Sequence, residues 1–170
     1  MRTVGRMIRS SIDKARAFFL KGRRIALVGA SRDPKDFSRY VLRELQARGY
    51  DVVPVNPALA DVAGLRAYPR VSDVEPPPDA ALLMIPAAAA EEAVGDCLRA
   101  RVRRIWLHRG AGPGVASEAV LALCAANRIE VVHGLCPMMA LPGTALPHRL
   151  HGALRRALSH AEPGHTCGVG

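Results

Sequence analysis

An unbroken apolar run that ends in glycine most constrains how this chain can fold. Ile25–Val28 reads Ile-Ala-Leu-Val, a pattern typical of a strand buried on both faces of a parallel sheet. Gly29 ends the run, and after a polar loop apolar residues recur at helical spacing until Gly49. A second apolar strand, Asp51–Val55, follows at once. This order of strand, glycine turn, helix and strand predicts a Rossmann-like α/β fold, doubly wound, with helices flanking a mainly parallel sheet.

The same alternation continues along the chain and predicts a single domain. We expect helix N-caps at Ser38 and Ser117, because a serine hydroxyl can accept a hydrogen bond from a free amide in the first helical turn. Further strands are expected at 80–85, 104–107 and 130–132, helices at 87–100 and 117–127, and an extended piece at 65–68. Residues 1–22 are expected to form a helical extension that packs on the domain, residues 23–160 the domain with a closing helix at 148–159, and residues 161–170 a flexible tail.

Composition narrows the class of partner. With 49% apolar and 23% charged residues among 170, the chain can bury a full core, and it has no apolar stretch near the roughly 20 residues that a bilayer requires. The N-terminus lacks the apolar segment of a secretory signal, so we expect a cytoplasmic location and reduced cysteines. A net charge of +9 favours an anionic partner. Because the arginines are scattered and aromatic residues make up only 4%, nucleic acid is a weaker candidate than a small anionic molecule.

The loops that follow the strands should meet at one edge of the sheet, where ligands of open α/β sheets bind, because crossover connections are right-handed. Gly29–Ser31 can bring the backbone close to a phosphate group, although the G-x-G-x-x-G pattern is incomplete because Ser31 and Pro34 replace later glycines. At the end of the second strand Asn56 stands where an NAD-binding domain usually has an acid. The edge is therefore suited to a nucleotide diphosphate and poorly fitted to NAD, unless Gly29 and Asn56-Pro57 serve only as tight turns.

Five segments, taken in order, resemble a known family. They are I-A-L-V-G-A-S at 25–31, G-Y-D-V-V-P-V-N-P at 49–57, Asp79 at the head of an apolar strand, I-W-L-H-R-G at 105–110 and G-L-C-P-M-M at 134–139. With them, the stretch from Arg23 to Pro142 resembles the small CoA-binding domain proteins, relatives of the CoA-binding domain of the succinyl-CoA synthetase α subunit. The resemblance implies a Rossmann-like fold that binds CoA, with the diphosphate near the first turn and the adenosine end near the loop after the second strand.

Residue by residue, the resemblance implies a set of cofactor-binding positions. The diphosphate would contact Gly29, Ala30 and Ser31, with Ser38 as a further donor. Asn56 and Pro57 would border the adenosine, and Pro86 would form another wall of the cleft. The loop at His108 and Arg109 lies on the same edge. Arg32 is the basic side chain next to the turn and is assigned to the 3′-phosphate of CoA. We expect Gly29→Val to weaken CoA binding and to leave the fold largely intact if the new side chain points into the cleft.

The sequence thus predicts a protein that binds CoA or an acyl-CoA as a small molecule, with no assigned catalytic residue and no metal site. Two alternatives stay open. One is acyl or thiol transfer by the Cys136 thiol, with His133 or His108 as base. The other is a regulator that senses an NAD-type dinucleotide and contacts DNA through a basic face. The terminal helices could also pack at the interface of a homodimer or on their own domain.

Overall fold

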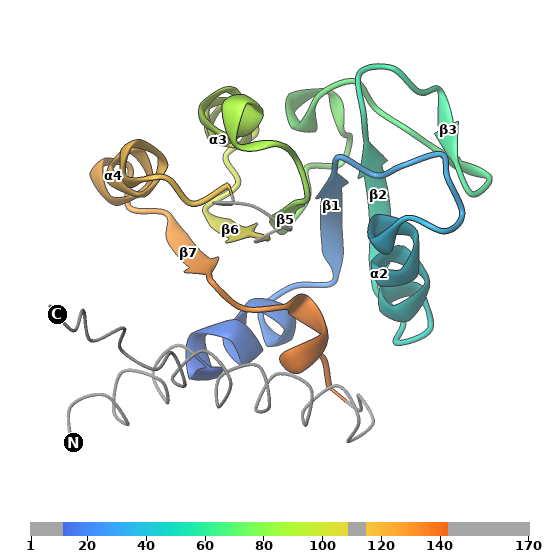
Figure 1. The fold of residues 1–170 in the computed structure, drawn as a ribbon, viewed down its shortest axis with the longest axis horizontal. Coiled ribbons are helices and arrows are strands. Elements are labelled where there is room, and N and C mark those ends of the chain that lie inside the picture. Colours follow the sequence, from blue (N-terminus) through green and yellow to red (C-terminus); the bar gives the residue numbers. More distant parts are fainter. Residues whose placement is uncertain (1–11, 109–114, 143–170) are drawn as a thin grey trace, which may run out of the picture.

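Five parallel strands form the central sheet of the computed structural model, which describes residues 12–108 and 115–142 (Figure 1). Their order is β2-β1-β5-β6-β7, and every neighbouring pair is parallel. An antiparallel hairpin of β3 and β4 forms a separate two-stranded sheet. The Rossmann-like α/β fold predicted from the sequence is confirmed. The strands are β1 (Arg24–Val28), β2 (Asp51–Val55), β3 (Asp61–Val62), β4 (Leu65–Arg66), β5 (Ala80–Leu83), β6 (Arg104–Leu107) and β7 (Glu130–His133).

Helices cover both faces of the sheet. Strand residues alternate between two apolar clusters, so that Ile25 and Leu27 face one layer of helices while Ala26 and Val28 face the other. The first layer holds a helix at residues 12–20 and α2 (Phe37–Gln46), and the second holds α3 (Ala90–Arg99) and α4 (Glu118–Ala126). Short 3₁₀ turns lie at η1 (Val71–Asp73), η2 (Ala87–Ala89) and η3 (Pro137–Met139).

The order of the strands reverses at β1. From β1 the chain passes through α2 to β2 on one side, and it returns later to place β5 on the other side of β1. The loops that follow β1, β2, β5 and β6 leave the sheet at the same edge, because these strands are parallel. We call this the carboxyl edge. In open α/β sheets, a ligand crevice lies at this edge where neighbouring connections run to opposite faces.

The helix at residues 12–20 is fixed by aromatic packing. Phe18 and Phe19 are 3% and 2% exposed, and their rings lie 5.4 and 5.3 Å from the ring of Trp106 on β6. The Tyr50 hydroxyl donates a hydrogen bond to the Phe19 carbonyl. The apolar positions of this amphipathic segment therefore serve the core of the domain.

Several element boundaries differ from the sequence prediction. Asp36, not Ser38, caps α2, because its carboxylate accepts a hydrogen bond from the Ser38 amide at 2.8 Å. The expected helix at 87–100 begins as the 3₁₀ turn η2, and the expected strand at 80–85 ends at Leu83. The cap at Ser117 is confirmed, since its hydroxyl accepts from the Val120 amide at 3.2 Å. The hairpin of β3 and β4 was not predicted.

Residues 1–11, 109–114 and 143–170 are not described. Arg109, the expected closing helix at 148–159 and the expected tail at 161–170 therefore lie outside the described residues. Within the described ranges, no helix combines the length and apolarity needed to cross a bilayer.

Candidate functional site

Gly29 forms the turn after β1 and lies against the exits of two neighbouring strands. Its φ of +86° falls in the left-handed region that glycine adopts without strain. Its amide donates a hydrogen bond of 2.9 Å to the Val55 carbonyl at the end of β2. A Cβ at this position would overlap the Met84 carbonyl oxygen and would lie 2.7 Å from Ile85 Cγ2. A side chain here would point into the exit of β5 and not into an open cleft. The condition under which Gly29→Val was expected to spare the fold is therefore not met, and we expect this substitution to destabilise the fold.

Two serines and an aspartate fix the next residues of the turn. The Ser31 amide donates to Ser38 Oγ at 2.9 Å, and the Ser38 hydroxyl donates to the Asp36 carboxylate at 2.5 Å. Ser38 is only 1% exposed, so its hydroxyl supports the turn from inside the protein. The first turn and the start of α2 are therefore joined through one buried hydroxyl.

This bonding pattern decides which backbone amide of the turn can meet a ligand. The amides of Gly29 and Ser31 are already bonded, and Ala30 is fully buried. Arg32 is exposed, and its amide has no acceptor among the residues that the structure describes. The Arg32 amide is thus the donor in this turn that a phosphate group can reach.

The side chain of Asn56 ties the first turn to the loop after β2. Its Nδ2 donates to the Ala30 carbonyl at 2.9 Å, and its Oδ1 accepts from the Ala58 amide at 2.9 Å. Both ends of the amide therefore have protein partners, which gives Asn56 a positioning role in addition to any ligand contact. Pro57 follows it in an exposed position.

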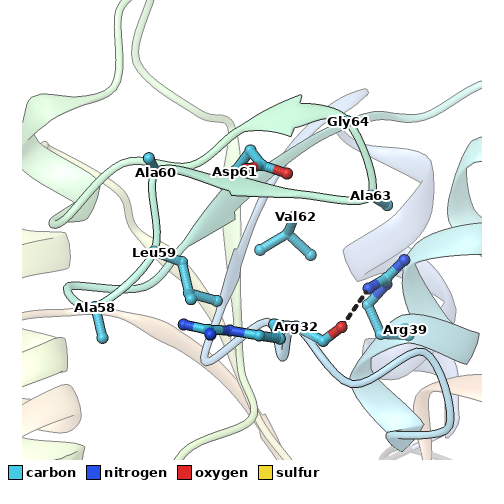
Figure 2. Close-up of a pocket in the computed structure, with 9 residues that line it drawn as sticks. All are labelled: Arg32, Arg39, Ala58, Leu59, Ala60, Asp61, Val62, Ala63 and Gly64. Atoms are coloured by element: carbon cyan, nitrogen blue, oxygen red, sulfur yellow. Dashed lines mark hydrogen bonds between the residues drawn. The ribbon is translucent and has the colours of Figure 1, made fainter.

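A cavity of about 480 Å³ opens between the first turn, α2 and the segment at residues 58–64. Figure 2 shows Arg32 and Arg39 on one side, with Leu59 and Val62 facing them from the segment. Asp61 precedes Val62 on β3, so the two side chains point to opposite sides of the strand, and the Asp61 carboxylate is turned away from the arginines. The cavity thus combines an apolar wall with two guanidinium groups. Its other lining residues are Ala58, Ala60, Ala63 and Gly64.

The two arginines differ in how they are held. Arg39 Nη1 donates to the Arg32 carbonyl at 3.0 Å, and Arg39 Nε is buried without a hydrogen-bond partner among the described residues. The Arg32 side chain is exposed and extends toward Leu59 (Figure 2). Neither guanidinium forms an ion pair within the described part of the chain. Their positive charge is therefore open to an anionic ligand.

His108 lies at the same edge but beside β5 and β6. Its amide donates to the Leu83 carbonyl at 3.0 Å, and its ring centroid lies 5.3 Å from that of Phe37 at the start of α2. Burial lowers the pKa of His108, and its Nδ1 atom is buried without a partner among the described residues. Burial therefore favours the neutral form of the ring.

The surroundings of Cys136 do not activate its thiol. Burial raises the pKa of Cys136, and hydrogen bonds from the Met138 and Met139 amides lower it by less. Within the described residues, no hydrogen bond joins this thiol to His133 or His108. A reactive cysteine needs the opposite shift, so the geometry gives no support to thiol transfer at Cys136.

The described residues also bring no three histidine, cysteine or acidic side chains together as a metal site would require.

The structure brings most of the predicted site residues to the carboxyl edge but separates them into groups. The first turn, Ser38 and Asn56 form one bonded unit, while Pro86 directly precedes the 3₁₀ turn η2 after β5. His108 lies farther along the edge, after β6. Sequence reasoning missed Arg39, because only the folded first turn brings its guanidinium to the Arg32 carbonyl. It also missed the wall formed by Leu59 and Val62, because only the folded segment at 58–64 turns them toward the first turn.

Comparison with known proteins supports the family resemblance found in the sequence. The family described as CoA binding domain matches residues 23–142. The α subunit of acetate–CoA ligase (ADP-forming) II from Pyrococcus furiosus is 32% identical over 81 residues, which is 47% of this chain and 18% of that protein. This chain spans less than half the length of the curated relatives it matches.

Solved structures share the fold. A hypothetical protein from Pyrococcus horikoshii superposes with a TM-score of 0.70 at 25% identity, covering 76% of this chain and 88% of its own. The dinucleotide-forming acetyl-coenzyme A synthetase 1 of Ca. Korarchaeum cryptofilum gives a TM-score of 0.56 at 30% identity, with 63% of this chain and 25% of that one covered. Because the family match spans most of the described residues and the solved relatives share the same sheet, this chain belongs to the CoA-binding domain family.

Proposed function

We propose that the protein binds CoA or an acyl-CoA as a small-molecule ligand at the carboxyl edge of the sheet. The observation that carries this proposal is the cavity between the first turn, α2 and the segment at 58–64, with an aliphatic wall on one side and, on the other, two guanidinium groups that form no ion pair with any described residue. The diphosphate would lie at the turn formed by Gly29, Ala30, Ser31 and Arg32, and the adenosine end would enter the cavity beside Asn56 and Pro57.

The chemistry of the cavity matches the adenosine end of CoA. The half-buried Leu59 can pack against a purine, which is a flat and weakly polar group, while Val62 is 1% exposed and supports that wall from the core. Arg32 and Arg39 can bind the 3′-phosphate that CoA carries on its ribose, because guanidinium groups form short, charge-assisted hydrogen bonds with phosphate oxygens. The Arg32 amide can donate to the diphosphate.

The same features disfavour NAD as the main ligand. NAD lacks the 3′-phosphate, so it would leave the two arginines without an anion. The residue directly after β2 is Asn56 and not an acid that could accept a hydrogen bond from the ribose hydroxyls, and Asn56 is already bonded to the Ala30 carbonyl and the Ala58 amide. Two of the relatives, the acetate–CoA ligase α subunit and the acetyl-coenzyme A synthetase, are enzymes of CoA chemistry by their names, which supports the choice of CoA.

Calorimetric titration of the full-length protein with four ligands tests the proposal. CoA, dephospho-CoA, 3′,5′-ADP and NAD differ in the groups that the cavity is expected to bind. CoA and 3′,5′-ADP should bind, dephospho-CoA should bind more weakly because it lacks the 3′-phosphate, and NAD should bind most weakly. Equal affinity for CoA and NAD would contradict the proposal.

Variants of the arginines locate the ligand. Arg39→Gln removes the half-buried guanidinium, and we expect a loss of about 10- to 100-fold in CoA affinity, the range for a hydrogen bond to a charged group. Arg32→Gln should act in the same direction. Arg43→Gln is a matched control, because Arg43 is exposed on α2 but does not line the cavity. Unchanged CoA affinity in Arg39→Gln would show that the cavity is not the binding site.

A further inference from the structure

The helices α2, α3 and α4 end in the same backbone motif but not in the same residue. In each, the amide of an apolar residue donates to the carbonyl five positions earlier, in the last turn of the helix, at 2.8–3.1 Å: Tyr50 to Leu45, Val102 to Cys97 and Ile129 to Cys124. The residue just before each donor has a positive φ, and it is Gly49 after α2, Arg101 after α3 and Arg128 after α4. Glycine fits this left-handed position without a clash of its Cβ. Two arginines therefore stand where glycine would fit with less strain, which indicates that their side chains serve a purpose other than ending the helices.

A third arginine joins these two at one place on the surface. Arg103 Nη1 donates to the Asn127 carbonyl at 2.8 Å, directly beside Arg128, and Arg101 lies two positions before Arg103. The helices α3 and α4 lie side by side (Figure 1), and β6 and β7 are neighbouring parallel strands. The loops that enter these strands therefore meet at the amino edge of the sheet, opposite the carboxyl edge. We call Arg101, Arg103 and Arg128 the arginine patch.

The positive charge of the arginine patch is not neutralised by its surroundings. All three side chains are exposed, and none forms an ion pair with a residue that the structure describes. The two acids on the neighbouring segments are already paired: Glu130 lies 3.0 Å from Lys21 Nζ, and the buried Asp96 lies 3.2 Å from Arg99 Nη2. The patch is thus a cationic surface formed by residues that are far apart in the sequence.

We infer that the arginine patch binds the phosphate backbone of a nucleic acid duplex. Guanidinium groups match phosphate oxygens with paired, charge-assisted hydrogen bonds, and a duplex presents phosphates in a dense, regular row. A protein partner or a membrane would call for apolar contacts as well, but the apolar residues of these loops, Val102 and Ile129, are only 1% and 7% exposed.

The composition of the two loops also favours a duplex over a single strand. Residues 99–104 and 127–130 include no aromatic side chain on which an unpaired base could stack. Contacts of the patch would therefore be to phosphates alone, and binding would not depend on the base sequence.

Glycine variants separate a binding role from a structural role. Arg101→Gly/Arg128→Gly removes two charges and restores the residue that ends α2, so we expect its Tm to be equal to or higher than that of the unchanged protein. Its affinity for a fluorescein-labelled DNA duplex of about 20 base pairs, measured by anisotropy at about 50 mM salt, should fall at least about tenfold. A plot of the logarithm of affinity against the logarithm of salt concentration should become less steep by about 2, because two phosphate contacts are lost.

Two further variants control for charge. Arg16→Gln/Arg43→Gln removes the same charge from exposed sites on the helix at 12–20 and on α2, in the other helix layer, and should keep the slope of the unchanged protein. Arg101→Lys/Arg128→Lys keeps both charges and should also keep that slope. CoA affinity should be the same in the glycine variant and the unchanged protein, because the patch lies at the opposite edge from the proposed CoA site.

Three results would overturn the inference. The first is equal duplex affinity in the glycine variant and in Arg16→Gln/Arg43→Gln. The second is an unchanged protein that leaves the duplex unbound at low salt, including the case in which it binds vesicles of anionic lipid or an acidic peptide instead. The third is a clear fall in Tm in the glycine variant, which would show that the arginines are needed to end the helices. None of these results bears on CoA binding, which the titration measures separately.

Discussion

Replacing Ser38 by alanine tests how the candidate site is held together. The hydroxyl of Ser38 makes two hydrogen bonds, one from the Ser31 amide at 2.9 Å and one to the Asp36 carboxylate at 2.5 Å. Ser38→Ala removes both and leaves the Ser31 amide without its acceptor. The first turn would then lose its direct hydrogen bond to α2.

The two bonds set the expected loss of stability. A neutral hydrogen bond contributes about 1 kcal/mol to folding and one to a charged group about 1.5–3 kcal/mol. Asp36 is exposed, so water can replace part of its lost bond, and the lower value applies. We therefore expect Ser38→Ala to lower the free energy of unfolding by about 2–3 kcal/mol. For a chain of this size, that is a fall in Tm of about 5–10 °C.

Urea denaturation followed by circular dichroism measures this loss, and Ser117→Ala provides the control. Ser117 caps α4 by accepting a single hydrogen bond of 3.2 Å from the Val120 amide, so its replacement should cost only about 1 kcal/mol. The same chemical change is thus made at a site with one bond and at a site with two. If Ser38→Ala loses no more stability than Ser117→Ala, the role given to Ser38 in fixing the turn is incorrect.

Three further changes have defined outcomes. Gly29→Ala and Gly64→Ala both place a side chain at positive φ, which costs about 1–2 kcal/mol. Only the new side chain in Gly29→Ala also overlaps the Met84 carbonyl. Urea denaturation should therefore show a larger loss of free energy of unfolding in Gly29→Ala than in Gly64→Ala. Asp96→Asn should lower the free energy of unfolding by about 2–3 kcal/mol. The buried Asp96 carboxylate accepts hydrogen bonds from the Val71 amide and the Ser72 hydroxyl, and the amide of asparagine would turn a donor toward one of them. An unchanged urea midpoint would contradict this prediction. Burial lowers the pKa of His108 in the folded state, so folding favours the neutral ring in preference to the protonated one. The stability that neutral His108 contributes to the folded state is therefore fully present above its ordinary pKa of 6.5 and is lost as the pH falls below that value. The free energy of unfolding should therefore fall more between about pH 7.5 and about pH 5.5 in the unchanged protein than in His108→Asn, and equal falls would contradict the assignment.

The parallel sheet was predictable because its signal is strong and repeated. Runs such as Ile25–Val28 and Asp51–Val55 are apolar on both faces, and each is separated from the next by a segment with helical spacing or turn residues. Once the strands are parallel, their loops must meet at one edge, so the placement of Gly29, Asn56 and His108 at that edge followed from topology.

The cap of α2 shows where sequence reasoning is weak. The segment Asp36-Phe37-Ser38 offers two residues that can cap a helix, only two positions apart. Aspartate prevails because its carboxylate also interacts favourably with the positive end of the helix, and the displaced serine hydroxyl is then free to bond the first turn. A pattern of residue types does not reveal which of two neighbouring caps is used.

The hairpin of β3 and β4 had no recognisable sequence signal. Each strand has two residues, and the connecting Ala63-Gly64 lacks the Asn-Gly or Asp-Gly pair that marks such turns, although both residues have positive φ. Arg39 was missed for a related reason: it lies seven positions after Arg32, and only the folded turn brings its guanidinium to the Arg32 carbonyl. The side of the cavity that holds the apolar wall therefore became visible only in three dimensions.

The source of positive charge at this site differs from that in many nucleotide-binding sheets. Phosphate groups often bind at the N-terminus of the helix that follows the first strand, where free amides point outward. Here Asp36 occupies that position with its own carboxylate, and the Ser38 amide is bonded to it. A bound phosphate must then depend mainly on Arg32 and Arg39 for its stabilisation.

Because interactions between mobile or exposed charges are screened by salt, CoA affinity should fall steeply with ionic strength. Asp36→Asn should strengthen CoA binding at low salt by removing a repelling charge, and weaker binding in that variant would show that the carboxylate is needed to shape the turn.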